Sequence, residues 1–299
     1  MALSNTHYTY DEIDFALKNT NSVYFIGIGG VSMSCLAEMC HEMALRVGGS
    51  DRSESAITKR LEEKGITVFY EHKAKQLDGY GIVVYTLAID LQNEEYKKAL
   101  DVGLLCISRA NFLGYLMCRY NTRIGVSGMH GKSTTTAMLA SVFAAANASP
   151  TVVSGAALSQ NEGCYRAGEK KNFIYEACEY MDSFLCFYPS ICVILNIELD
   201  HTDYFADLNA VCESFEKALR RLEPDGLAVL NFDDEHVMKI GNALPGHKKT
   251  TFGLKVGANV RAIDIEEKGG YYSFTVLKDG VSLGRITLGT PGETHFYSA

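Results

Sequence analysis

The segment GVSGMHGKSTTTAML, residues 125–139, decides how this chain folds. A strand-like run leads through two glycines into a helix-like run, with Gly-Lys-Ser at positions 131–133. The standard phosphate-binding loop has a further glycine five positions before Gly131. This chain has Val126 there, and its nearest glycine is Gly128. The segment is therefore either a nucleotide site of a shorter pattern or an accidental Gly-Lys-Ser.

The residue types in this segment favour a nucleotide site over an exposed glycine turn. Gly128 and Gly131 permit a backbone curl that turns N–H groups toward an anion. Lys132 offers a cation for the β- and γ-phosphates, and Ser133 offers a hydroxyl to Mg²⁺. A helix beginning at Thr134 would add its positive amino-terminal end.

The composition limits how a phosphate ligand could be held. The chain has 299 residues, 47% of them hydrophobic, which is enough for about two domains with cores of their own. Lysine and arginine number 28 against 36 acidic residues, a formal net charge of −8. This balance gives no electrostatic reason to expect nucleic acid or an anionic membrane as a partner. Any phosphate must be bound locally.

The cysteines and the amino-terminal sequence predict a cytoplasmic protein. The nine cysteines form no C-x-x-C pair, and most lie in apolar runs, as expected for reduced thiols in the cytosol. The first residues lack the basic start and apolar core of a signal peptide. The most apolar long stretch, residues 23–40, contains three glycines and Glu38, so it is not a membrane span.

The order of elements predicts an α/β fold. Strand-like and helix-like runs alternate up to residue 121, which predicts a Rossmann-like, doubly wound parallel sheet in a domain of residues 1–121. A P-loop-type α/β central domain is predicted for residues 122–299, with a small antiparallel hairpin around Asp279-Gly280. The expected strands are 22–30, 45–51, 66–70, 82–86, 104–108, 121–128, 173–178, 191–197 and 226–232; the expected helices are 32–43, 56–65, 94–103, 110–120 and 209–223.

A first glycine turn, FIGIGGVSMS at residues 25–34, follows the first strand. The dinucleotide pattern G-x-G-x-x-G would place glycine at position 32, where this chain has Ser32. Small residues there still let a helix amino terminus approach a diphosphate. Asp51 lies 22 residues beyond Gly29 at an expected strand end, which suits contact with a ribose hydroxyl. A tight turn without a ligand and a nicotinamide cofactor are the alternatives.

The second turn decides between them, because its form G-x-[HN]-G-K-[ST]-T resembles the ATP loop of the Mur ligases, the amide-forming enzymes of peptidoglycan synthesis. Histidine at position 130 points to the branch that adds L-alanine to UDP-N-acetylmuramate. VYFIGIGGVSMS resembles the UDP-binding turn of that branch, and EACEYMDSFL with ILNIELDHTDYF resembles its paired metal segments. TPGETHFYSA resembles its P-G-x-H-N-x-x-N segment.

The resemblance implies a set of site residues. The implied ATP-binding residues are Gly128, Met129, His130, Gly131, Lys132, Ser133 and Thr134. The implied UDP-sugar residues are Gly27, Gly29, Gly30, Met33, Ser34, Ser50 and Asp51. Ser133, Glu176 and His201 would bind Mg²⁺, with Mn²⁺ as an alternative, and the implied catalytic residues are Lys132, His130, Glu176 and His201.

Other polar residues near these segments are given lesser roles. Glu179, Asp200 and Asp203 are expected behind the metal ligands or as helix caps, and Asn196 is expected to orient a ligand. The histidines outside any constellation, which are His41, His72, His236 and His247, are expected on the surface.

The chain departs from the family pattern at a few positions. Met129 replaces the usual threonine of the loop, and Ser32 replaces a glycine of the UDP turn. His295 and Ser298 stand where the family has asparagines, so no function is carried onto them. The family also has a C-terminal domain that closes over ATP and helps to recruit the amino acid, and this chain is expected to be a fragment without it.

The implied reaction has two steps. The carboxylate of UDP-N-acetylmuramate attacks the γ-phosphate of ATP to give an acyl phosphate, and the amine of L-alanine then displaces phosphate. A recycling ligase that adds a whole tripeptide to the same nucleotide sugar shares most of these motifs. A non-catalytic nucleotide-binding module is a further alternative, while GMHGKST argues against a nicotinamide oxidoreductase. The oligomeric state is left open.

Overall fold

The computed structural model describes residues 3–158 and 163–292, which form two compact units. The first unit contains Met1–Arg119 and Gly155–Ala167, and the second contains Tyr120–Ser154 and Gly168–Ala299. The two predicted domains were continuous in sequence, whereas the structure groups the segment 155–167 with the first unit. One contact that holds this segment is the hydroxyl of Tyr165, which donates to Glu42 Oε2 at 2.6 Å.

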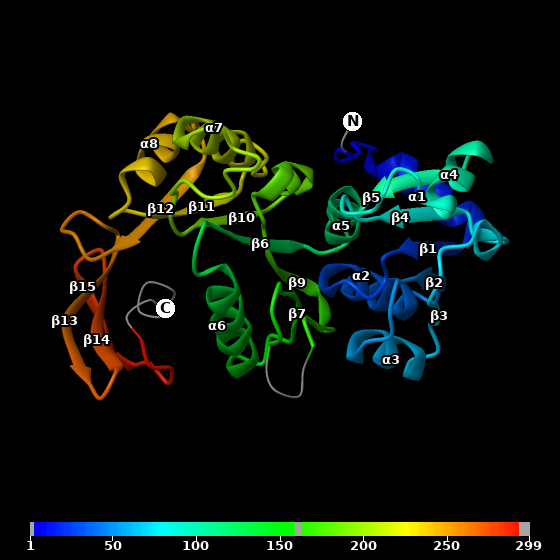
Figure 1. Cartoon of the computed structure of the whole chain (residues 1–299). Helices are drawn as coiled ribbons and strands as arrows, with labels where there is room; N and C mark the ends of the chain where they lie inside the picture. The colour runs from blue at the N-terminus through cyan, green and yellow to red at the C-terminus, as the bar shows by residue number, and fades with distance from the viewer. Residues whose placement is uncertain (1–2, 159–162, 293–299) are drawn as a thin grey trace. The chain divides into compact units, whose positions relative to one another are not determined.

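The first unit is built on a five-stranded parallel sheet of order β3-β2-β1-β4-β5 (Figure 1). Its strands are β1 (Ser22–Ile26), β2 (Arg46–Ser50), β3 (Thr67–Phe69), β4 (Ile82–Tyr85) and β5 (Leu105–Ser108). The helices are α1 (Tyr10–Thr20), α2 (Val31–Glu42), α3 (Ala56–Glu63), α4 (Glu94–Asp101) and α5 (Arg109–Met117), with the 3₁₀ turn η1 (Ala74–Leu77). Helix α2 packs against α3 and α5, while α4 packs against η1. The predicted doubly wound sheet is confirmed.

Strand β1 is buried along its whole length because it lies at the centre of this sheet. Every predicted strand and helix of the first domain is present, but α1 was not predicted. Its amino terminus carries a capping box in which Thr9 and Glu12 hydrogen-bond reciprocally. The pattern T-x-x-E was therefore a readable start signal.

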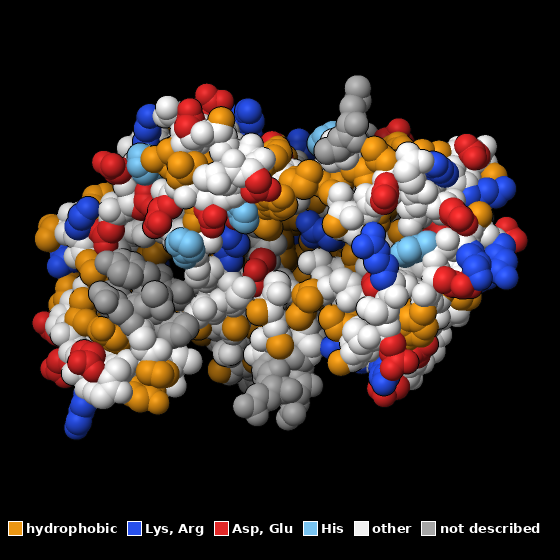
Figure 2. All heavy atoms as spheres, viewed as in Figure 1, with side chains coloured by type: hydrophobic (Ala, Val, Ile, Leu, Met, Phe, Trp, Pro, Cys, Tyr) orange, Lys and Arg blue, Asp and Glu red, His pale blue; other side chains and the backbone are white. Residues whose placement is uncertain are grey.

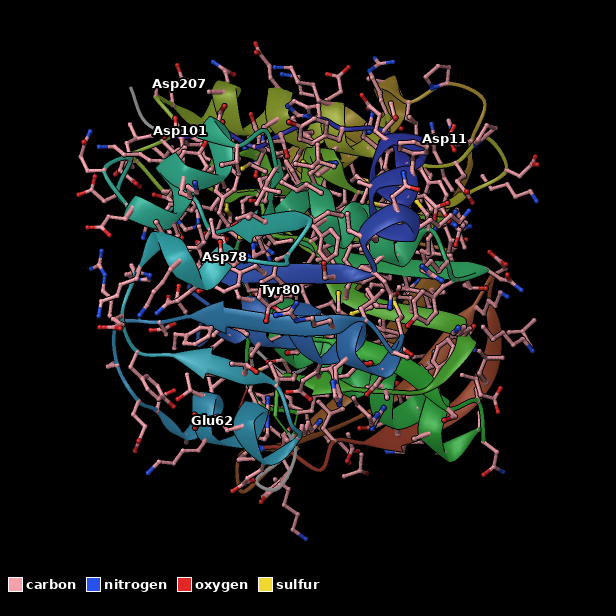
Figure 3. The ribbon with its side chains drawn as sticks, turned by 90° about the vertical axis from the view of Figure 1, so that its right-hand side faces the viewer. Asp11, Glu62, Asp78, Tyr80, Asp101 and Asp207 are labelled. Atoms are coloured by element: carbon pink, nitrogen blue, oxygen red, sulfur yellow. The ribbon has the colours of Figure 1, made fainter. Side chains whose placement is uncertain are left out.

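The connection from β3 to β4 has only the short turn η1 in place of a full helix. A cavity of about 500 Å³ lies there, lined by Arg46, Asp78 and Tyr80 among others. Figure 3 shows Asp78 and Tyr80 beside the strands of this sheet. The guanidinium of Arg46 lies 4.4 Å from the centre of the Tyr80 ring and covers it.

The second unit contains a larger sheet in which the strands follow the order β15-β14-β13-β12-β11-β10-β6-β9-β7. These strands are β6 (Thr122–Ser127), β7 (Pro150–Val153), β9 (Glu169–Glu176), β10 (Ile191–Ile194), β11 (Leu227–Asn231), β12 (Lys248–Gly253), β13 (Val260–Lys268), β14 (Tyr271–Lys278) and β15 (Val281–Thr287). The helices are α6 (Lys132–Ala145), α7 (Leu208–Leu219) and α8 (Glu235–Ala243), and η2 spans Tyr180–Cys186. The short strand β8 (Tyr165–Arg166) lies in the segment 155–167.

The pairs β7–β9, β9–β6, β6–β10, β10–β11, β11–β12 and β12–β13 are parallel, whereas β13–β14 and β14–β15 are antiparallel. The predicted hairpin at Asp279-Gly280 joins β14 to β15 and is confirmed. Because β6 pairs with β10 on one side and β9 on the other, the loops after these strands meet at one edge of the sheet.

All nine cysteines lie in the described residues, and none of them forms a disulfide bond. Burial raises the pKa of the Cys35 and Cys192 thiols to about 12, so both stay protonated at neutral pH. Among the described residues, no helix combines the length and apolar character that a membrane crossing requires.

Candidate active site

The loop between β6 and α6 is the centre of the candidate site. It turns through Gly128 at φ 142° and Gly131 at φ 84°, both in the region that favours glycine. A Cβ atom on Gly128 would lie 3.0 Å from Leu195 Cβ, so the close approach of the following loop also requires glycine. Helix α6 begins at Lys132 rather than at the predicted Thr134, because Thr135 N already donates to Gly131 O at 2.9 Å.

Asn196, which lies just after β10, holds the β6–α6 loop in place by hydrogen bonds. Its Oδ1 accepts from His130 N at 2.9 Å, and its Nδ2 donates to His130 O at 3.0 Å. Its carbonyl accepts from Met129 N at 3.3 Å. Asn196 was expected to orient a ligand, and the structure shows that it orients the loop itself.

The ammonium of Lys132 contacts carbonyl groups of its own loop and the carboxylate of Glu179. Its Nζ donates to Gly128 O at 2.5 Å and to Met129 O at 3.1 Å. It also lies 3.1 Å from both carboxylate oxygens of Glu179. The side chain of Glu179 is fully buried and that of Lys132 is 15% exposed. This pair is therefore shielded from the water that weakens surface ion pairs.

His201 joins the same carboxylate from the loop after β10. Its Nε2 lies 3.2 Å from Glu179 Oε1, and the centre of its ring lies 4.7 Å from that of Tyr180, with the two rings tilted by 42°. The backbone of His201 is in the left-handed region at φ 50°. Its N–H donates to Asp200 Oδ1 at 2.6 Å, and this hydrogen bond lowers the pKa of the Asp200 carboxyl. Asp203 accepts from the hydroxyl of Tyr180 at 2.6 Å.

Glu176 ends β9 and is paired in register with Val126 of β6, so it lies at the same edge of the sheet as the loop. Its Oε1 accepts from Ser154 Oγ at 2.7 Å. Of the residues predicted to bind metal, the structure places His201 against Glu179, which was expected only behind the ligands. Within the described residues, no group of three or more His, Cys, Asp and Glu side chains is arranged to hold a metal ion. The predicted set Ser133, Glu176 and His201 stays a prediction.

The donor types around the loop nevertheless suit a hard divalent cation. Glu176 and Glu179 supply carboxylate oxygens, Ser133 a hydroxyl and His201 an imidazole nitrogen. The carboxylate of Glu179 is buried, and its cationic partner is a lysine that a cation could replace. The residues present therefore fit Mg²⁺.

In the first unit, the predicted UDP turn runs from Gly27 at φ 84° to Gly30, which caps α2. Asp51 Oδ2 accepts from Gly29 N at 2.8 Å, and Oδ1 accepts from Arg52 N at 2.8 Å. The carboxylate thus ties the turn to the end of β2. The implied residues Met33, Ser34 and Ser50 are buried, with Ser34 Oγ donating to Val31 O and Ser50 Oγ to Glu95 Oε2.

The structure also shows a polar cluster that sequence reasoning missed. Glu95 is fully buried and accepts from Tyr24 Oη at 2.5 Å and Ser50 Oγ at 2.6 Å. His72, expected on the surface, has its Nδ1 2.8 Å from Glu95 Oε2. Desolvation raises the pKa of Tyr24 well above its usual range, and the Glu95 carboxylate adds to this shift. No local pattern in the sequence links these residues.

Comparison with known families covers nearly the whole chain. Residues 22–121 match the Mur ligase family, catalytic domain, and residues 126–298 match the Mur ligase middle domain. The segment TPGETHFYSA continues into residues 293–299, so His295 and Ser298 lie outside the described residues.

Curated relatives are named UDP-N-acetylmuramate–L-alanine ligase. The chain is 40% identical over 286 residues to that of Clostridium novyi, covering 96% of this chain and 62% of the relative. It is 42% identical over 280 residues to that of Caldicellulosiruptor saccharolyticus, covering 93% of this chain and 61% of the relative. The chain thus spans about three fifths of the length of these relatives.

Two solved structures show the same fold. The UDP-N-acetylmuramate:L-alanyl-gamma-D-glutamyl-meso-diaminopimelate ligase of Neisseria meningitides superposes with a TM-score of 0.81 at 27% identity, covering 93% of this chain and 90% of that chain. The UDP-N-acetylmuramate-alanine ligase of Thermotoga maritima superposes with a TM-score of 0.79 at 28% identity, covering 93% of this chain and 62% of that chain.

Proposed function

Because the chain belongs to the Mur ligase family, we propose that it forms the nucleotide-binding part of an ATP-dependent ligase that joins L-alanine to the carboxylate of UDP-N-acetylmuramate. The relatives at about 40% identity carry the name of that activity. This chain spans about three fifths of their length, so the activity is proposed for a protein of the full family length.

The observation that carries the proposal is the cluster of Lys132, Glu179 and His201 beside the glycine loop. These residues are far apart in sequence and meet where β6, β9 and β10 end. A cation within a glycine loop, next to the first turn of a helix, is an arrangement that binds nucleotide phosphates.

The proposed reaction assigns each of these groups a task. The carboxylate of UDP-N-acetylmuramate attacks the γ-phosphorus of ATP, which gives an acyl phosphate and ADP. The amine of L-alanine then attacks the acyl carbon, the phosphate leaves and the amide forms. Lys132 and the first N–H groups of α6 offset the charge on the transferring phosphoryl group. The side chain of His130 is 66% exposed, and in this proposal it contacts the transferring phosphoryl group from the loop.

A divalent cation completes the charge balance of this proposal. Ser133, Glu176, Glu179 and His201 are the residues that would hold Mg²⁺, which when bound neutralises phosphate charge. The protein side chains orient the nucleotide, and Asn196 keeps the loop in the shape that receives it.

A second candidate is the ligase that adds a whole tripeptide to the same nucleotide sugar. The likeness to the Neisseria structure, which the chain matches over 90% of that structure's length, favours it. The higher identity to the L-alanine ligases favours the first candidate. Comparison of L-alanine with the tripeptide as acceptor, in a protein of full family length, separates the two.

Calorimetry of this chain tests the proposal directly. UDP-N-acetylmuramate, ATP with Mg²⁺, and NAD are titrated in turn into separate samples. We expect binding of UDP-N-acetylmuramate, weaker binding of ATP and no binding of NAD. Binding of NAD with no response to either of the other two would overturn the proposal in favour of an oxidoreductase.

A further inference from the structure

The ammonium of Lys132 has all its hydrogen-bonding capacity in use. A lysine ammonium carries three N–H donors and no acceptor. In the structure these donors face Gly128 O, Met129 O and the two oxygens of Glu179, at 2.5–3.1 Å. The cation that is expected to contact phosphate therefore has no donor left for it in this arrangement.

Glu179 is the charged partner among these four acceptors. Its side chain is fully buried, and it is shared between Lys132 and the Nε2 of His201. A buried carboxylate is costly unless a cation accompanies it. The free-energy cost of moving Lys132 away from Glu179 is therefore small only if another cation takes its place.

We propose that Glu179 holds Lys132 away from phosphate, and that a divalent cation releases the lysine by replacing it on this carboxylate. When the cation binds Glu179 and His201, the ammonium of Lys132 moves to the nucleotide phosphate. Glu179 thereby couples the binding of nucleotide to the binding of the metal. This inference rests on the proposed nucleotide site and adds an order of events to it.

The proposal makes a prediction in the absence of metal, where a simple metal-ligand role for Glu179 predicts only the small gain that removal of a nearby negative charge gives. Glu179→Gln keeps the shape of the side chain but removes its charge, so Lys132 becomes free to bind phosphate. In EDTA, the variant should bind ADP about tenfold more tightly than the wild type, within the 5–150-fold range usual for coupled sites. Mg²⁺ should increase ADP affinity in the wild type and leave it nearly unchanged in the variant.

The experiment is calorimetric titration of ADP into this chain, with EDTA and with Mg²⁺, for the wild type and the variant. Glu198→Gln is the matched control, because Glu198 is 64% exposed and lies 3.7 Å from His130 of the same loop. It removes the same charge near the same phosphates without touching Lys132. We expect the control to change ADP affinity in EDTA less than about twofold, since exposed charges interact weakly.

Unchanged or weaker ADP binding by Glu179→Gln in EDTA would overturn the proposal, as would an equal gain in Glu198→Gln. If Glu179→Gln fails to fold, Glu179→Asp keeps the charge but shortens the reach to Lys132, and should give a smaller gain of the same sign. Lack of ADP binding by the wild type in both conditions would overturn the proposed function together with this inference. ADP binding by the wild type with no gain in either variant would overturn the inference alone.

Discussion

The two glycine turns of this chain have similar backbone arrangements, but the charged side chain at the first is acidic and the one at the second is basic. Each follows a central parallel strand, β1 or β6, and each leads directly into a helix, α2 or α6. In the first turn a protein carboxylate, Asp51, accepts from the amide of Gly29. In the second turn a lysine lies within the loop and is held by Glu179.

From this difference we infer which ligand suits each turn. The residues of the first turn, 25–34, contain no basic side chain, so this turn suits a ligand held by hydroxyl groups and backbone amides. The second turn adds a cation to the unpaired N–H groups of a helix amino terminus, which suits a polyphosphate. Substitutions in the two turns should therefore affect different ligands.

Replacement of the lysine should separate the two turns most clearly. In a protein of full family length, Lys132→Ala should lower the rate of amide formation by about 10²–10³-fold, the usual cost of removing one group that stabilises the transition state. Binding of UDP-N-acetylmuramate should be retained, because the two turns belong to separate units, and sites that share no contacts behave nearly independently. A coupled phosphate assay and calorimetry measure the two quantities, with Lys217→Ala on the exposed face of α7 as the control. Loss of both functions in a folded variant would contradict the division.

The carboxylate and imidazole at the second turn should control the metal requirement. Glu176→Gln and His201→Ala should each raise the Mg²⁺ concentration for half-maximal activity by about 10–100-fold, as losses around a metal commonly do. A magnesium titration of the full-length protein measures this. Normal titration curves for both variants would remove these residues from the metal site.

At the first turn, Asp51→Ala should weaken binding of UDP-N-acetylmuramate. The change removes the acceptor of Gly29 N, and a hydrogen bond to a charged group contributes about 1.5–3 kcal/mol. Asp51→Asn keeps an acceptor for Gly29 N but loses the charge, so comparison of the two variants separates turn geometry from charge. ADP binding should stay the same in both, and unchanged UDP-N-acetylmuramate affinity would show that Asp51 is not part of that site.

The smallest effect is expected at the residue that fastens the second turn. Asn196→Ala loses the reciprocal pair of hydrogen bonds with His130 and should weaken ADP binding by about 1 kcal/mol, or roughly fivefold. Asn196→Asp keeps the acceptor of His130 N and loses the donor to His130 O. Its affinity for ADP is therefore expected to lie between those of the wild type and Asn196→Ala. Calorimetry in Mg²⁺ measures both, and an Asn196→Ala affinity equal to the wild type would mean that the loop holds its shape alone.

Much of the fold could be predicted because its signals are local. The glycine turns, the alternation of strands and helices, and Asp279-Gly280 each lie within a few consecutive residues. The arrangement around Glu179 could not be read in this way. The chain passes from Glu179 through Met181 and Asp182, both at positive φ, before it reaches the rest of η2. A strand-end pattern singles out Glu176, whereas no local pattern predicts this backbone or the contact between Glu179 and Lys132.

The cluster of Glu95, Ser50 and His72 was missed for a different reason. Its members come from separate segments of the first unit and meet only after the sheet forms. Each residue alone is as compatible with the surface as with the interior. By contrast, Thr9 and Glu12 at the start of α1 gave a usable local signal that was overlooked.

Strand β15 is the last strand in the order of the larger sheet, and every one of its residues is exposed. Val281 and Leu283 are 66% and 65% exposed, and hydrophobic side chains are visible over β13–β15 at the left of Figure 2. A long edge of this kind is a template for pairing with another strand, so concentrated solutions should tend toward self-association and precipitation. Gly284 at φ 125° and the shifted register between Val276 and Leu277 interrupt the ladder and oppose such pairing. The balance between this exposed edge and its interruptions should therefore influence how readily the protein associates with itself.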